Sequence, residues 1–173
     1  ATTIQLVTKD GLEKWLKALS NGQRAAVEAQ KFEAKSGQVA IVHDGDEWFA
    51  AGGVNDPEEL SSYCLAALAD KLPEGTYRLD GQRPGAAMHG WQTAQYRFTR
   101  YKEDEDAPGQ RILLSKEVKQ IDDAMALAAA ENLVRDLVNT PAEDMGPAAL
   151  EAECERLAKD HNAKLKVTKG DTL

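Results

Sequence analysis

The pattern of hydrophobic positions near the start of the chain predicts one short strand followed by two helices. The strand is expected at residues 3–7. Leucine and tryptophan side chains between Leu12 and Leu19 then stand at positions i, i+3, i+4 and i+7, which is the spacing of one face of an amphipathic helix. A second short helix is expected over residues 23–31.

Two apolar runs further along predict a β-hairpin. Residues 39–42 and 48–51 flank the dipeptide Asp44-Gly45, which is typical of tight turns between antiparallel strands.

The next segment carries a helix-start signal. Asp56 suits the N-cap and Pro57 the first helical position, and the two glutamates after them favour the positive end of a helix. Apolar residues from Leu60 to Leu68 lie on one face, and Pro73–Gly75 ends the pattern. The sequence therefore predicts a helix that begins at Pro57.

The remaining elements of the first domain are less regular. Residues 76–81 are interpreted as a strand, and residues 111–114 as the last strand of the region. Residues 88–101 fit either a helix or an alternating strand, and the longer pattern favours helix. The acidic segment 103–109 is interpreted as a loop. Alternating helices and strands predict an α/β layered domain over residues 1–114, with a sheet that is at least partly parallel.

Residues 115–139 predict a helix of unusual length. Its apolar residues cover much of its circumference, which is typical of a helix buried between two layers. We interpret it as a junction helix that leads into a second domain.

A second domain is expected to begin within residues 140–173. A helix is predicted from Pro147, with Leu150 and Cys154 on its inner face, and a strand is predicted over residues 163–169. These elements cannot close a core alone, because a sheet covered by helices needs more strands. The sequence therefore predicts the truncated start of a second α/β domain.

Composition narrows the class of protein. The chain has 173 residues and a net charge of −8, which disfavours binding to nucleic acid. No apolar run reaches membrane-spanning length, and the first residues do not resemble a signal peptide. We expect a cytoplasmic protein whose Cys64 and Cys154 are reduced, although a disulfide between them is conceivable.

Few residues suggest chemistry by this chain itself. Its three histidines fall in different predicted elements, without metal-ligand spacing. Gly52-Gly53, between a strand and a helix, could present backbone amides to an anion, but an ordinary tight turn is the favoured interpretation. Paired acids such as Asp122-Asp123 are abundant and are expected to be solvated, and only Glu143-Asp144 lies inside a loop of specific shape.

The loop after the junction helix is the most specific stretch of the sequence. Pro141 restricts the residue before it to extended conformations and so ends the long helix. Asn139 can bond backbone groups at that end, and Gly146-Pro147 starts the next helix. On physical grounds alone, a rigid helix–helix connection explains these features.

Residues 134–150 read VRDLVNTPAEDMGPAAL. This resembles ARDLVNTPANDMGPAEL, a run typical of bacterial members of the leucyl aminopeptidase (cytosol aminopeptidase) family of two-metal peptidases; Glu143 stands where asparagine is common. Residues 75–79 and 90–102 resemble the N-terminal region of that family in the same order, and residues 150–167 resemble the segment after the loop in that family.

The resemblance implies a macro-domain-like N-terminal α/β domain, a long connecting helix and a C-terminal catalytic domain. It implies two divalent ions, commonly Zn²⁺ or Mn²⁺, which activate a bridging water, and assembly into hexamers. The ligand motifs of the family are not found in this sequence, so no catalytic or metal-binding residue is assigned to the chain. The resemblance assigns only a structural loop, whose residues are Arg135, Asp136, Asn139, Thr140, Pro141, Asp144, Met145, Gly146 and Pro147.

The chain is therefore expected to be the N-terminal part of a metallo-aminopeptidase that removes N-terminal amino acids from peptides. By itself it should be inactive and should bind no metal, and peptides would bind through the missing catalytic domain. The alternative is a stand-alone macro-like module that binds nucleotide-type ligands, or a scaffold without catalysis.

Overall fold

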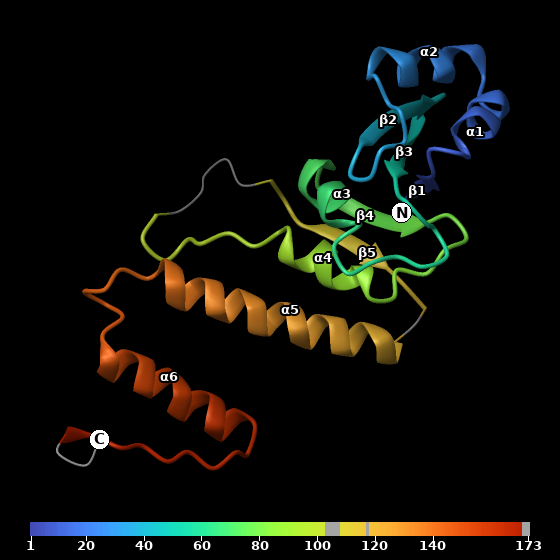
Figure 1. Ribbon diagram of the computed structural model, residues 1–173. Coiled ribbons are helices and arrows are strands. Elements are labelled where there is room, and N and C mark those ends of the chain that lie inside the picture. The colour runs from blue at the N-terminus through green and yellow to red at the C-terminus, as the bar shows by residue number, and fades with distance from the viewer. Residues whose placement is uncertain (103–107, 117, 171–173) are drawn as a thin grey trace. The chain divides into compact units, whose positions relative to one another are not determined.

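The computed structural model describes residues 1–102, 108–116 and 118–170. The chain divides into two compact units, Ala1–Glu131 and Asn132–Leu173. The described strands are β1 (Thr2–Val7), β2 (Val39–Asp44), β3 (Glu47–Gly53), β4 (Gly75–Leu79) and β5 (Arg111–Leu114). The described helices are α1 (Leu12–Ala18), α2 (Asn21–Ala29), α3 (Ala66–Lys71), α4 (Ala87–Thr93), α5 (Val118–Asn139) and α6 (Pro147–Asp160) (Figure 1).

The first unit is built on a five-stranded mixed sheet in the order β2-β3-β1-β4-β5. Strands β3, β1, β4 and β5 are parallel, and β2 pairs antiparallel with β3. In the hairpin, Asp44 pairs with Glu47, and Gly45 has a φ of 64°, a left-handed conformation that glycine adopts without strain. The predicted hairpin and the partly parallel sheet are confirmed.

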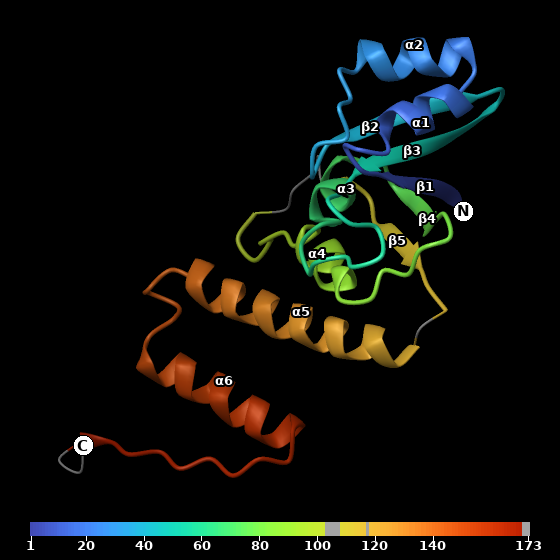
Figure 2. The same cartoon turned by 45° about the vertical axis from the view of Figure 1, so that its right-hand side comes forward.

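Helices α1 and α2 cover one face of the sheet, over β1, β2 and β3 (Figure 2). Val27 and Phe32 pack there against the strand residues Val7, Val42 and Ala51. Helix α2 begins with a capping box in which Ser20 and Gln23 bond each other's backbone amides.

The opposite face of the sheet carries the larger core. Leu68 of α3 and Trp91 of α4 pack with Ile4, Tyr77 and Leu113 of the strands. The Trp91 indole donates a hydrogen bond of 2.9 Å to the carbonyl of Arg111, which joins α4 to β5. The buried guanidinium of Arg111 in turn donates to the carbonyl oxygen of Ala69 on α3 and to that of Gly109.

The helix predicted from Pro57 does not form there. The Asp56 carboxylate accepts hydrogen bonds from the amides of Glu58 and Glu59, so the predicted cap is present. The helix of this segment, α3, nevertheless begins only at Ala66. The intervening backbone is held by another element, because the Gly90 amide donates to the Ser62 carbonyl at 2.7 Å. That long-range bond fixes a non-helical path.

The predicted helix over residues 88–101 is correct only in its first part, since α4 ends at Thr93. The Gln95 side chain accepts from the Arg111 amide and donates to the Arg111 carbonyl, which draws the chain toward β5. The Arg97 guanidinium bonds the carbonyls of Ala94 and Tyr96. Of the predicted loop 103–109, residues 103–107 lie outside the described residues.

Helix α5 forms as predicted but is buried on one side only. Ala124 and Ala128 are buried, whereas Leu127 is 57 % exposed and Val138 is 77 % exposed. Among the described residues, one layer covers this helix, and the expectation of a second layer stays a prediction.

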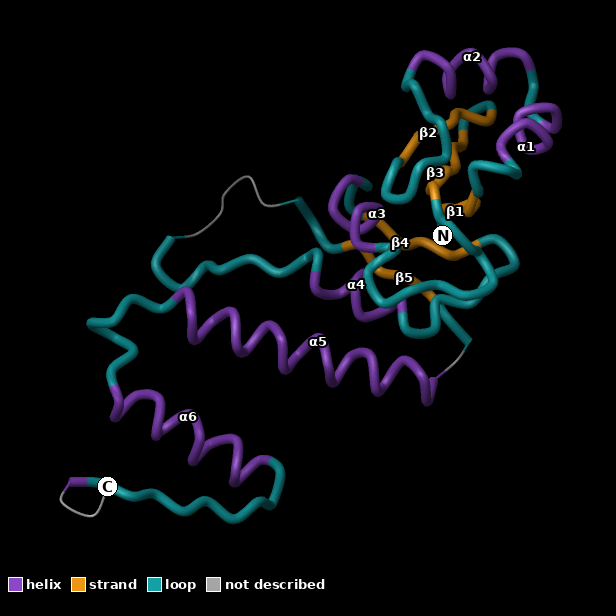
Figure 3. The backbone as a smooth tube through the Cα atoms, viewed as in Figure 1, coloured by secondary structure: helices purple, strands orange, loops and turns teal. Residues whose placement is uncertain are grey.

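The second unit contains the end of α5, the connecting loop, α6 and an extended segment (Figure 3). Helix α6 begins at Pro147, as the Gly-Pro pair predicts, with Gly146 as its N-cap. Its expected inner face is uncovered, because Leu150 and Cys154 are exposed. Residues 163–169 form no strand, since no described segment supplies the pairing partner that a strand needs.

Candidate functional site

The family-motif loop is ordered by its own backbone. The amide and hydroxyl of Thr140 donate to the Asp136 carbonyl at 3.0 Å and 2.7 Å, and Thr140 is the buried residue of the loop. The amides of Asp144 and Met145 both donate to the Pro141 carbonyl at 2.9 Å. These bonds form a compact turn between two helices.

The remaining motif residues sit around this turn. Arg135 lies on α5 and is half-buried, while Asp136 and Asn139 are exposed on the last turns of the same helix. The carboxylates of Glu143 and Asp144 belong to exposed residues. The arrangement connects two helices, and the backbone bonds of the loop are those of a structural turn.

The histidines are separated in the structure as in the sequence. His43 is exposed on β2, His89 is buried on α4 and His161 follows α6. Within residues 1–102, 108–116 and 118–170, no group of three histidine, cysteine, aspartate or glutamate side chains is placed to hold a metal ion.

The Gly52-Gly53 pair does not present free amides to an anion. The Gly53 amide donates to the Gln38 carbonyl at 2.8 Å, and the next amide, of Val54, donates to the Val7 carbonyl at 3.0 Å. A Cβ at Gly53 would overlap the carbonyl oxygen of Lys35, and one at Gly52 would lie 2.7 Å from Leu68 Cδ1. The pair allows close packing at the end of β3.

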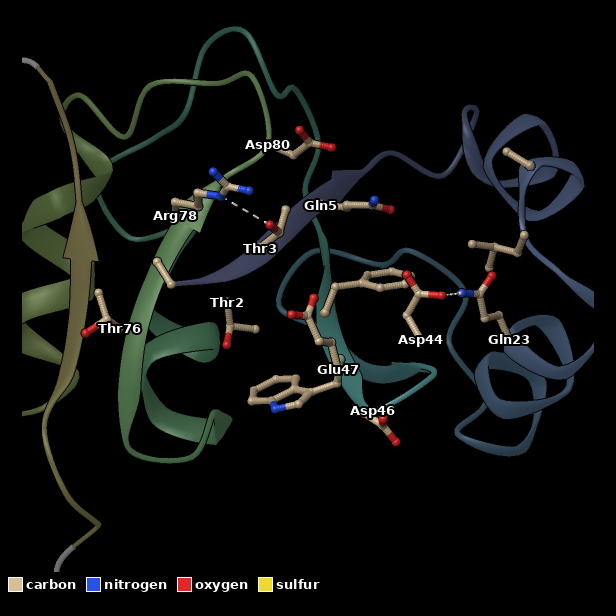
Figure 4. Close-up of a pocket in the computed structure, with 15 residues that line it drawn as sticks. Thr2, Thr3, Gln5, Gln23, Asp44, Asp46, Glu47, Thr76, Arg78 and Asp80 are labelled. Atoms are coloured by element: carbon tan, nitrogen blue, oxygen red, sulfur yellow. Dashed lines mark hydrogen bonds between the residues drawn. The ribbon is translucent and has the colours of Figure 1, made fainter.

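A groove of about 880 Å³ lies where helices α1 and α2 leave part of the sheet uncovered (Figure 4). Its floor includes Thr3, Thr76 and Arg78 from β1 and β4, and the Arg78 Nε donates to the Thr3 hydroxyl at 3.3 Å. Its other lining residues include four acids, which are Asp44, Asp46, Glu47 and Asp80. The groove cannot be recognised in the sequence, because strand pairing alone brings these residues together.

The groove offers a polar surface whose charged side chains are mainly acidic. At one wall, the Gln23 side chain donates to the Asp44 carboxylate at 3.1 Å (Figure 4). Histidine and cysteine are absent from the described residues that line it.

A second polar cluster lies on the other side of the sheet. His89 is 4 % exposed, and its Nε2 lies 2.9 Å from Oε2 of Glu131 on α5. The same Glu131 oxygen accepts from the Tyr63 hydroxyl at 3.0 Å. The Tyr63 and His89 rings meet edge to face, with centroids 4.9 Å apart.

Like the groove, this cluster cannot be recognised in the sequence. Its members are distant along the chain, and only packing joins them. The contact between His89 and Glu131 has ion-pair distance but not hydrogen-bond geometry, so neither ring nitrogen has a hydrogen-bond partner among the described residues. Beside the cluster is an open pocket of about 410 Å³, lined by Ser62, Asp123 and Leu127 among others.

Comparison with known proteins assigns the chain to a family. Residues 2–114 match the M17 aminopeptidase, N-terminal domain. A probable cytosol aminopeptidase of Wolinella succinogenes is 27 % identical, over 79 % of this chain and 32 % of that protein.

Two solved structures extend the comparison to nearly the whole chain. The cytosol aminopeptidase of Coxiella burnetii is 26 % identical and matches 98 % of this chain with a TM-score of 0.81, over 38 % of its own length. The bottromycin maturation enzyme BotP in complex with Mn is 22 % identical and shares the fold, with a TM-score of 0.73 over 99 % of this chain and 39 % of its own. The chain thus spans less than two fifths of each of these relatives. It belongs to the M17 aminopeptidase family and contains, in residues 2–114, the N-terminal domain of that family.

Proposed function

We propose that this chain is the N-terminal part of a metal-dependent, leucyl-type aminopeptidase that removes N-terminal amino acids from peptides. The observation that carries the proposal is the match of residues 2–114 to the N-terminal domain of M17 aminopeptidases. The similarity to the Coxiella cytosol aminopeptidase, over 98 % of this chain but 38 % of that one, supports it. The macro-domain-like shape of residues 1–114 and the assignment of residues 115–139 to a junction helix belong to the same proposal.

The metal ions of the proposed enzyme would lie outside this chain. The described residues do not fit a two-metal centre, because they bring no three suitable side chains together. We therefore propose that two divalent ions, Mn²⁺ or Zn²⁺, are held by a catalytic domain beyond these residues, and we derive no catalytic step from the residues described. The Mn-bound structure of the similar enzyme BotP supports manganese as the first ion to test.

The role of this portion is proposed to be folding, oligomerisation or control of access to the active site. The supporting observation is the exposed apolar surface of α5, where Leu127 and Val134 are each 57 % exposed and Val138 is 77 % exposed. Such a surface is suited to contact with further protein. A homo-oligomer, such as a hexamer, would use it.

A cytoplasmic location is part of the proposal. The Wolinella relative is named a cytosol aminopeptidase. Among the described residues, no helix combines the length and hydrophobicity needed to cross a membrane.

The test compares two proteins in hydrolysis of leucine p-nitroanilide with added Mn²⁺. One is this chain, and the other is this chain extended by whatever the coding DNA encodes after the codon for Leu173. We expect turnover that requires Mn²⁺ from the extended protein and none from the chain alone. Metal-dependent turnover by the chain alone would contradict the placement of the metals, and a natural stop codon after Leu173 would contradict the proposed enzyme.

A further inference from the structure

Alanine side chains make up the fully buried part of α5 among the described residues. Its buried contacts on the first unit include Ala124 and Ala128, and the run from Ala124 to Ala130 contains five alanines. Sliding the helix by one turn, about 5.4 Å, would put one alanine close to the place of another. Methyl groups that look alike at each turn discriminate poorly between such positions, so the buried alanines specify the register of α5 only weakly. The larger Ile121 also packs against this core, but it is only partly buried.

Glu131 breaks this uniformity, because it is a charged side chain on α5 that reaches two partners. Its Oε2 accepts from the Tyr63 hydroxyl at 3.0 Å and lies 2.9 Å from Nε2 of the buried His89. Tyr63 belongs to the segment before α3, and His89 belongs to α4. A slide by one turn would break both contacts at once.

The cluster is a poor source of stability. Burying an imidazole whose nitrogens have no well-formed hydrogen bond costs free energy that an apolar side chain of similar size would not cost. Buried polar groups of this kind can specify one packing arrangement without adding stability, as polar residues do at the seam of coiled coils.

We propose that Tyr63, His89 and Glu131 form a register key, which fixes the axial position of α5 on the first unit. Glu131 is also the last residue of that unit. This inference does not depend on the proposed peptidase function.

The test measures the position of α5 directly. Spin labels are attached to cysteines that replace Lys14 and Ala126, two exposed residues of the first unit, in a chain whose native cysteines are replaced. Electron–electron resonance then gives the distance distribution between α1 and α5. We expect one narrow distribution for the parent chain and a broadened or two-peaked one, shifted by at most about 5 Å, for the double variant His89→Leu/Glu131→Leu.

The matched control is Asp122→Asn, which removes an exposed carboxylate from the same helix and should leave the distribution narrow. Circular dichroism verifies that each variant is folded. If the double variant does not fold, Glu131→Ala takes its place, because it removes the carboxylate oxygen that contacts both Tyr63 and His89; it too should broaden the distribution relative to the control. A distribution that stays narrow and unshifted in the folded variant would overturn the proposal, since packing alone would then fix the helix.

Discussion

The two units of this chain differ in how completely they cover their apolar residues. In the first, Trp91, Ile4 and Leu65 are fully buried. In the second, no residue of α6 is buried, and Leu150, Leu165 and Val167 are 48 %, 44 % and 44 % exposed. Both units contain helices with clear local start signals. The difference teaches that a helix such as α6 can form around a local start signal, whereas a core requires a second layer to pack against.

The largest effect is expected from removing the central side chain of the first unit. Trp91→Ala should lower the free energy of unfolding by about 3–5 kcal/mol, because it leaves a cavity and removes the hydrogen bond to the Arg111 carbonyl. Leu150→Ala in the second unit should cost about 1 kcal/mol or less, since half of that side chain is already exposed. Urea denaturation followed by circular dichroism measures both. Equal losses would refute the contrast between the units.

Close backbone packing gives the next effect. A Cβ at Gly90 would overlap the Ser62 carbonyl oxygen and approach Tyr63 Cα to 2.7 Å. Gly90→Ala should therefore destabilise the first unit by about 1–3 kcal/mol. The control is Gly22→Ala in α2, which meets no atom within 4 Å and should be neutral or stabilising by up to about 1 kcal/mol. A neutral Gly90→Ala in thermal unfolding would show that the segment before α3 moves freely.

The reaction rates of the two cysteines, one in each unit, provide a further comparison of the units. Burial raises the pKa of the Cys64 thiol above its ordinary value, so less of the reactive thiolate is present at neutral pH, and the sulfur is also half-buried. Cys154 is exposed. With a disulfide reagent at pH 7, Cys154 should react roughly tenfold faster or more, and the rate at Cys64 should rise as the pH is raised toward its thiol pKa. Single variants Cys64→Ala and Cys154→Ala assign the two phases; equal rates would mean that the region around Cys64 is open.

A smaller effect is expected at the surface of the first unit. Ser20→Ala removes one half of the capping box of α2 and should cost about 1 kcal/mol. Ser20→Asn keeps a capping oxygen and serves as the control. Chemical denaturation of both variants tests whether the cap stabilises the whole unit, and identical stability of the two would show that it does not.

The sequence alone could predict the elements whose signals are local. The Asp44-Gly45 turn and the two apolar runs beside it define the hairpin. Gly146-Pro147 marks the start of α6, and Pro141 marks the end of α5. In each case the residues that decide the conformation are neighbours, so their chemistry can be recognised before any folding is known.

Only some of the candidate sites could be predicted from the sequence. The motif loop was visible because its unusual residues are consecutive. The groove and the Tyr63–His89–Glu131 cluster were not, because strand pairing and helix packing bring together residues from distant segments.

What the sequence by itself determined is the order of the elements and the family to which the chain belongs; every described element was expected, and one further strand, over residues 163–169, was expected but does not form. The tertiary structure decided where α3 begins and where α4 ends, since the bond from the Gly90 amide to Ser62 and those from Gln95 to Arg111 override local helical preference. It also decided which face of α5 is covered. The physical reason is that a backbone group bonds to whichever partner the fold brings near, and a long-range partner is invisible in local sequence.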